Sequence, residues 1–139
     1  MRTIKFRAWD KENNKFRSDD FLMSLDGEIL DPKTFPFTIR KDVELMQFTG
    51  LKDKNGKEIY EGDIIDYDDN DNMLTDSGIY AVGWNDEVAG FGMMGIDLRD
   101  ENMGISGYGT DDYCHHVVDY VLPKSKIIGN IYENKDLLK

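Results

Sequence analysis

The sequence predicts a mainly β protein of antiparallel hairpins, with an SH3-like, partly open small barrel and a short C-terminal helix. Three observations lead to this fold class. Short runs of residues alternate between apolar and polar side chains, which is typical of half-buried strands. Turn dipeptides such as Asp26-Gly27 and Asn55-Gly56 separate these runs. Finally, the chain has no long stretch with the spacing of an amphipathic helix.

The N-terminal part is predicted to form two hairpins. From Thr3 to Trp9 the side chains alternate, with Ile4, Phe6 and Ala8 on the side expected to be buried. Residues 10–14 form a polar turn to a second strand at 15–17. The dipeptide Asp26-Gly27 is typical of a type I′ turn, because both residues tolerate a positive φ.

The clearest local pattern lies between residues 43 and 67. A strand over 43–50 leads into a tight hairpin turn at Asn55-Gly56, after which the chain returns to Tyr60. The segment Glu61-Gly62-Asp63 resembles the entry to a strand of an SH3-like barrel, and residues 64–67 are predicted to be that strand.

The remaining elements follow from the same signals. Strands are predicted over 79–84 and 91–96, paired across a turn at Asn85-Asp86. Six glycines between positions 90 and 109 predict a loop or flap. Residues 113–122 fit a strand or a short helix that Pro123 ends, and 125–132 are predicted to form a strand. Asn134 is expected to cap a last helical turn over 135–139.

Length and charge indicate the organisation of the chain. With 139 residues, 1–139 is expected to be a single domain, with hairpins in 1–60 and the barrel-like part with acidic, Gly-rich loops in 61–139. The net charge is -11, and residues 61–119 alone carry 15 acidic and one basic side chain, a net charge of -14. Direct binding of nucleic acid is therefore not expected, because it depends on Lys and Arg that displace counterions.

The expected location is the cytoplasm. Cys114 is the single cysteine, so the chain cannot form an internal disulfide, which fits a reducing compartment. The N-terminal residues alternate charged and apolar side chains and lack the continuous apolar run of a signal peptide. The longest uncharged stretch near the middle of the chain is too short for a membrane helix.

Three blocks of sequence resemble the YopX family of phage and prophage proteins. They are IKFRAWD at residues 4–10, LMQFTGLKDKNGKEIYEGD at residues 45–63 and IGNIYEN at residues 128–134. The blocks occur at the start, middle and end of the chain in the family's order. The resemblance implies a small β-rich phage protein of undetermined function, and it supplies no catalytic residues.

Two motifs suggest metal or cofactor chemistry without completing it. Cys114, His115 and His116 are soft ligands, but adjacent strand residues point to opposite faces and there is no further Cys or His to complete a zinc site. The segment Gly90 to Gly95 matches G-x-G-x-x-G, although no helical pattern follows to receive a pyrophosphate. No metal, cofactor or catalytic residue is therefore expected.

The acidic run that includes Asp66, Asp68, Asp69 and Asp71 is the candidate partner-binding site. An EF-hand alignment fails, because Asp71 and Ser77 occupy the positions that require Gly and Glu. A cluster of carboxylates can, however, steer basic partners toward this part of the surface.

These observations lead to three functional hypotheses. The first is a non-enzymatic phage accessory protein that binds another protein, of phage or host. The alternative is an acidic decoy that mimics DNA and occupies a host nucleic-acid-binding protein. The third is a metal-dependent hydrolase that uses the aspartates or residues 114–116. Self-association is also left open, because exposed hairpin edges pair readily between subunits.

Overall fold

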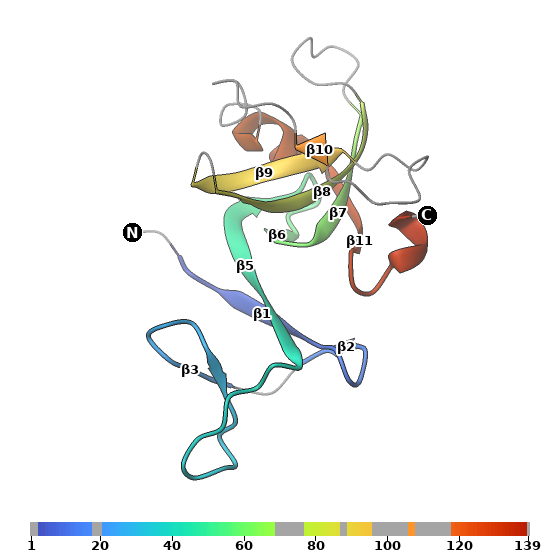
Figure 1. Ribbon diagram of the computed structural model, residues 1–139. Coiled ribbons are helices and arrows are strands. Elements are labelled where there is room, and N and C mark those ends of the chain that lie inside the picture. Colours follow the sequence, from blue (N-terminus) through green and yellow to red (C-terminus); the bar gives the residue numbers. More distant parts are fainter. Residues whose placement is uncertain are drawn as a thin grey trace.

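The computed structural model describes residues 3–17, 21–68, 77–86, 89–95, 106–107 and 118–138. Their strands form three sheets (Figure 1), ordered β2-β1-β5-β6, β10-β9-β8-β7-β11 and β3-β4. Every pairing between these strands is antiparallel. The predicted fold class, a mainly β protein built from hairpins, is therefore confirmed.

The first sheet contains two of the predicted hairpins, the one around residues 10–14 and the one around Asn55-Gly56. Its strands are β1 (Phe6–Asp10), β2 (Lys15–Phe16), β5 (Val43–Lys52) and β6 (Glu58–Tyr60). In the first hairpin Trp9 is paired with Phe16, and in the second Lys52 is paired with Glu58. The long strand β5 also pairs with β1. Its other end extends to the second sheet (Figure 1).

The second sheet curls into a half-barrel (Figure 1). Its strands are β7 (Asp63–Tyr67), β8 (Gly78–Asn85), β9 (Gly90–Gly95), β10 (Ser106–Gly107) and β11 (Lys126–Asn130). The predicted strands at 64–67, 79–84, 91–96 and 125–132 are thus present within a few residues of their expected bounds. Trp84 is paired with Phe91, as expected for strands joined across the turn after Asn85.

The main core fills the concave side of this half-barrel. Its buried members are Ile59, Ile65, Tyr67, Tyr80, Val82, Val118, Val121 and Leu122. Ile59 comes from β6, and the partly buried Leu51 comes from β5. Side chains from both sides of position 60 therefore share one core, and the hairpin β5-β6 covers one side of the half-barrel.

Helical structure in the described residues is limited to short turns. Residues 118–121 are helical and continue into η1 (Leu122–Lys124), so the described part of the segment 113–122 is a helix, and residues 113–117 lie outside the described residues. Pro123 lies inside η1, so the end comes at Ser125, which is extended. The predicted C-terminal helix is η2 (Lys135–Leu138). Asn134 does precede it, but its side chain accepts a hydrogen bond from the backbone N–H of Asn130.

The predicted burial of β1 is wrong at its N-terminal end. Ile4 is 64% exposed and Phe6 is also exposed, whereas Trp9, placed on the opposite face, is only 4% exposed. The reason is a long-range contact: the Trp9 ring stacks on Tyr132 at 6.1 Å and meets the edge of Phe16 at 5.0 Å. Because Ala8, on the predicted face, is also buried, β1 is covered on both faces at its C-terminal end, and the contact with Tyr132 covers the Trp9 face.

The predicted type I′ turn at Asp26-Gly27 is wrong, because only the glycine has a positive φ, of 84°. The tight hairpin turn predicted at Asn55-Gly56 is present, with a φ of 82° at Gly56. The Gly56 N–H donates to the Asp53 carbonyl at 2.9 Å, which fits a type I turn followed by a left-handed glycine. The predicted glycine-rich flap is wrong over 90–95, because these residues form β9 and pair with β8. The rest of that segment lies largely outside the described residues.

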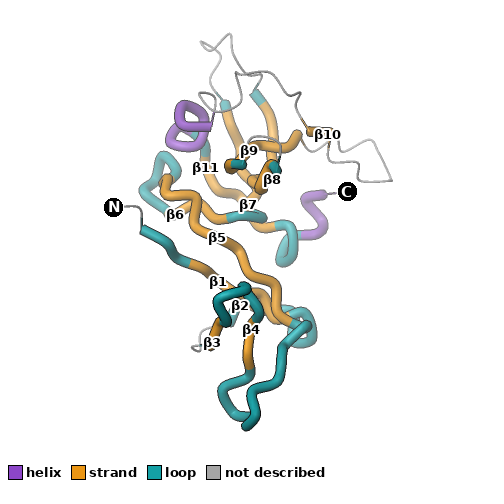
Figure 2. Tube along the Cα trace, turned by 60° about the vertical axis from the view of Figure 1, so that its left-hand side comes forward, coloured by secondary structure: helices purple, strands orange, loops and turns teal. Residues whose placement is uncertain are grey.

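A separate ribbon extends from the first sheet, away from β9 and β10 (Figure 2). It consists of β3 (Leu22–Met23), β4 (Ile29–Leu30) and the loop up to a bridge between Leu30 and Ile39. We call residues 21–42 the apolar arm. Ile29 anchors it, because this buried side chain packs with Ala8 and Val43 in a second, smaller core.

Candidate functional site

The acidic residues proposed from the sequence are only partly described by the structure. Asp66, in β7, and Asp68, just after it, are both exposed. Asp66 lies directly opposite Lys126 in the neighbouring strand β11, so a basic side chain adjoins it in the sheet. Asp69 and Asp71 lie outside the described residues. The structure therefore brings two of the four candidates to the same part of the surface.

The structure describes only one of the two motifs considered for metal or cofactor binding. Cys114, His115 and His116 lie outside the described residues. Among the residues that the structure does describe, no three His, Cys, Asp or Glu side chains gather closely enough to hold a metal ion. The glycines of the G-x-G-x-x-G match lie in β9, within a sheet. The described ranges contain no helix with the length and apolar character needed to cross a membrane.

The three sequence blocks meet at a buried carboxylate. Arg7 of β1 forms an ion pair with Asp63 of β7, whose side chain is almost fully buried. The side-chain amide of Asn130 in β11 donates a hydrogen bond, at 3.4 Å, to Asp63 Oδ1, the oxygen that Arg7 also contacts. The other oxygen accepts a hydrogen bond from the backbone N–H of Tyr60 at 2.8 Å. Both oxygens of Asp63 are thus engaged, which suits a structural junction between sheets better than proton transfer.

Arg7 is held on several sides at this junction. Its guanidinium lies 4.8 Å from the ring centres of both Phe16 and Tyr60, within the range of cation–π contacts. It also donates to the Glu61 carbonyl oxygen at 3.3 Å. Glu61 in turn accepts a hydrogen bond from the backbone N–H of Gln47 at 2.9 Å. These contacts join β1, β5 and β7, so they give the first and central sequence blocks a structural role.

A second buried carboxylate, Asp53, shapes the β5-β6 turn. Its Oδ1 accepts hydrogen bonds from the backbone N–H groups of Asn55 and Lys57, each at 2.9 Å. Its Oδ2 accepts one from Ile127 of β11 at 3.1 Å. Burial raises the pKa of Asp53, but the backbone N–H groups of Ile127, Lys57 and Asn55 outweigh burial and hold the pKa below its usual value. This carboxylate is therefore committed to structure too.

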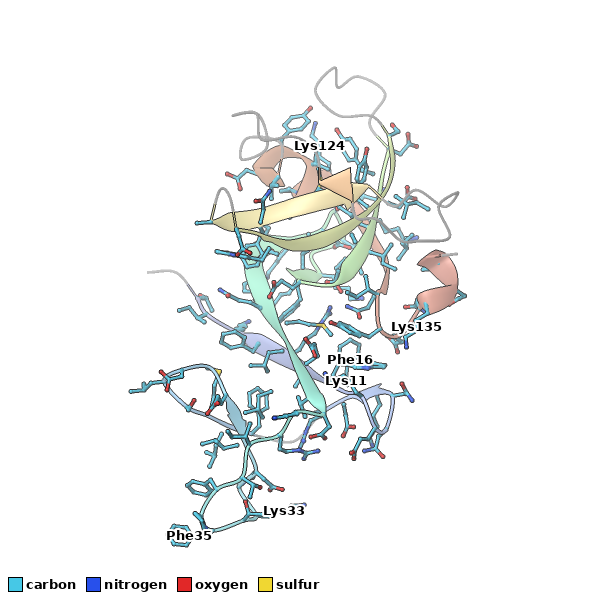
Figure 3. All side chains as sticks on the ribbon, viewed as in Figure 1. Lys11, Phe16, Lys33, Phe35, Lys124 and Lys135 are labelled. Atoms are coloured by element: carbon cyan, nitrogen blue, oxygen red, sulfur yellow. The ribbon has the colours of Figure 1, made fainter. Side chains whose placement is uncertain are left out.

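The apolar arm presents a different kind of surface. Six of its apolar side chains are exposed: Leu22, Met23, Leu25, Phe35, Phe37 and Ile39. Phe35 is 94% exposed, and Leu25 is fully exposed. Figure 3 shows Phe35 and Lys33 at the far tip of the arm. Because scattered exposed apolar residues are normal on proteins, what distinguishes the arm is their concentration in one short segment.

The backbone pairing arranges some of these side chains on one face. Leu22 is paired with Leu30, and Leu30 is bridged to Ile39, so this row of three apolar residues crosses the ribbon. Directly opposed residues project from the same face of a sheet. Near the tip, the rings of Phe35 and Phe37 meet edge to face with their centres 6.1 Å apart. The arm therefore offers an ordered apolar surface.

The arm is also nearly neutral. Residues 21–42 contain four acidic and three basic side chains, which gives a net charge of -1. Arg40 and Asp42 form an ion pair at its base. The hydrogen bond from Arg40 holds the pKa of Asp42 below its usual value. The arm differs in this respect from the acidic segment 61–119.

Sequence reasoning missed this surface. It selected the acidic run as the candidate binding site and took no account of Phe35 and Phe37 on either side of Pro36. Two aromatic residues next to turn-forming residues were the available signal, since an apolar side chain in a loop has few neighbours to cover it.

Comparison with known proteins places the chain as follows. A family model described as YopX protein matches residues 5–139. A comparison with curated proteins finds no match. Among solved structures, the crystal structure of protein EF1440 from Enterococcus faecalis is similar, with a TM-score of 0.60, 24% sequence identity and 99% of each chain covered. That likeness shows the fold alone.

Proposed function

The chain belongs to the YopX family, and on that premise we propose that it is a non-enzymatic phage or prophage accessory protein that binds another protein. The apolar arm is the binding surface, and the cytoplasm of the bacterial host is the location. The observation that carries the proposal is the group of exposed apolar side chains on the arm, with Phe35 at its tip. Large exposed apolar patches on soluble proteins commonly mark interaction sites.

The commitment of the buried carboxylates supports the non-enzymatic part of the proposal. Asp10, Asp53 and Asp63 are the buried acids of the described residues, and both oxygens of each accept hydrogen bonds or an ion pair. A general base needs an oxygen within reach of a substrate proton. The best-placed acids of the described residues therefore serve the fold.

Affinity capture from a bacterial host lysate, followed by binding measurements with each purified captured protein, tests this function. The test variant is Leu25→Ser with Phe35→Ser, because both side chains are exposed and their loss should leave the fold intact. The matched control is Ile4→Ser, which removes an exposed apolar side chain outside the arm. We expect the arm variant to lose binding and the control to retain it. Equal binding by both variants would contradict the proposal.

The acidic decoy is a second candidate, supported by the exposure of Asp66 and Asp68. It differs in its salt dependence, because electrostatic capture of basic proteins weakens as ionic strength rises. Changing Asp66, Asp68, Asp69 and Asp71 to Asn should abolish capture if the decoy hypothesis is right. If the arm is the binding surface, capture should survive these changes and persist at high salt.

A further inference from the structure

We propose that the partner of the apolar arm is a second copy of this chain, so that two arms pack together in a twofold dimer. This inference rests on the proposed function, since it identifies the protein that the arm binds. It goes beyond that function by fixing the partner, the symmetry and the charged side chains that set the orientation.

The exposed area is of the size that such a contact needs. With each exposed aromatic side chain taken at about 200 Å², and the aliphatic ones at somewhat less, the six arm residues expose on the order of 600 Å². This sum is at the upper end of the largest apolar patches on soluble monomers, about 300–600 Å², and stable interfaces bury about 800 Å² on each partner. The six apolar side chains with the polar atoms between them approach that size.

The charge distribution favours contact through the arms over contact through the acidic segment 61–119. Each chain carries a net charge of -11, and the segment 61–119 carries -14, so two copies repel strongly when those segments meet. The arm carries only -1, and it extends away from β9 and β10 (Figures 1 and 2). Contact through the arms therefore joins two nearly neutral surfaces and keeps β9 and β10 of the two copies away from the interface.

The charged side chains of one arm can pair with those of a second arm. Asp26 and Glu28 lie in the exposed turn between β3 and β4, and Lys33 lies in the exposed loop after β4. In a twofold interface each contact occurs twice, with the two copies exchanging roles. Packing two arms in opposite directions brings the acidic turn of one copy to the Lys33 loop of the other, and the same pairing recurs on the other side of the axis.

The small size of the ribbon points the same way. β3 and β4 contribute two residues each, and among the described residues β3 pairs with β4 alone. An isolated two-stranded ribbon is marginal in water unless a further strand or an apolar contact supports it. Leu22 and Met23 of β3 are both exposed. Ile29 already anchors β4 in the smaller core, and a second arm would cover the exposed side chains of β3.

Sedimentation equilibrium of the full chain over a range of concentrations tests the proposal. We expect a mass that rises from 16.0 kDa toward twice that value. In Leu25→Ser with Phe35→Ser the dissociation constant should rise at least about tenfold, and in Ile4→Ser it should stay the same. A wild-type chain that stays monomeric at all concentrations overturns the dimer. If that monomer still binds a different protein through the arm, the proposed function stands without the dimer.

A pair of charge reversals tests the orientation independently of folding. Lys33→Glu alone and Asp26→Lys alone each place like charges together twice in a homodimer, so each variant should dimerise more weakly than wild type at low salt. An equimolar mixture restores both attractive contacts, and we expect it to form a heterodimer about as tight as the wild-type dimer. A mixture that associates no better than its separate components overturns the proposed packing.

Discussion

The Oδ2 atom of Asp53 accepts a hydrogen bond from the backbone N–H of Ile127 at 3.1 Å, across 74 positions of sequence. The same carboxylate holds the turn of the β5-β6 hairpin through its other oxygen. A single side chain therefore shapes a local turn and ties it to the strand β11, which lies at the border of the half-barrel sheet. Since the turn lies in the central sequence block and β11 in the last one, this contact gives both blocks a structural reason.

Asp53→Asn should destabilise the protein by about 1–3 kcal/mol, because the amide cannot accept at both ends. The Asn oxygen can keep the bonds to Asn55 and Lys57, but its NH₂ group would then face the Ile127 N–H, donor to donor. Urea unfolding followed by tryptophan fluorescence measures the loss. Asp26→Asn, at an exposed turn, is the matched control and should change stability by less than about 0.5 kcal/mol. Equal effects of the two changes would contradict the role of Asp53.

Stability should fall in acid, and Asp53 should contribute to that fall. Its pKa in the folded protein lies below the ordinary value of 3.8, so the unfolded chain binds the proton first as the pH drops. The contribution of Asp53 is complete above about pH 5 and is lost as the pH falls through 3.8 toward the lower folded value. Unfolding free energies of wild type and Asp53→Asn between pH 2 and pH 7 should therefore converge at low pH. Parallel curves would show that Asp53 does not titrate in this way.

The Arg7–Asp63 ion pair should show strong coupling between its partners. Arg7→Met leaves the buried carboxylate of Asp63 without its cation and should cost about 3–5 kcal/mol. Adding Asp63→Asn removes the uncompensated charge, so the double variant should be more stable than Arg7→Met alone. A double-mutant cycle in urea measures this coupling. Simple addition of the two single effects would indicate that the pair contributes nothing beyond its separate side chains.

Gly129→Ala should loosen the C-terminal helix η2. A Cβ atom at Gly129 would lie 2.7 Å from Asn134 Oδ1 and 2.8 Å from Leu137 Cδ1, both closer than normal contact. Displacing Asn134 also breaks its hydrogen bond with the Asn130 N–H. We expect a loss of about 1–3 kcal/mol and faster amide exchange over residues 130–138. Gly92→Ala, where the nearest atom is at 3.8 Å, is the control and should leave exchange in that segment unchanged.

The sequence predicted those parts of the fold that depend on nearby residues. The hairpins at residues 10–14 and 53–57 follow from polar and glycine-containing turns between apolar runs, and the structure contains both. The burial of Trp9 could not be predicted in this way, because it depends on Tyr132, more than 120 residues along the chain. For the same reason the burial of Asp53 and Asp63 could not be predicted, because their partners include Ile127 and Arg7, which are distant in sequence.

The candidate surface was harder to predict than the fold. Leu22, Phe35 and Ile39 are ordinary core residues by type, and only the arrangement of the ribbon leaves them with few neighbours. The acidic segment attracted attention because charge is visible in any sequence, whereas exposed apolar residues are visible only once the fold is known. The acidic segment 61–119 can therefore be recognised from the sequence, whereas the apolar arm can be recognised only from the structure.

Photo-cross-linking from position 35 in intact bacteria tests most directly whether the apolar arm binds a protein. A benzoylphenylalanine that replaces Phe35 probes the tip of the arm, and the same probe in place of Ile4 serves as the control. We expect a specific adduct from position 35, with the mass of two chains, and none from position 4. An adduct of position 35 with a different protein would support the binding surface and overturn the dimer. No adduct from position 35, or equal adducts from both positions, would contradict the account.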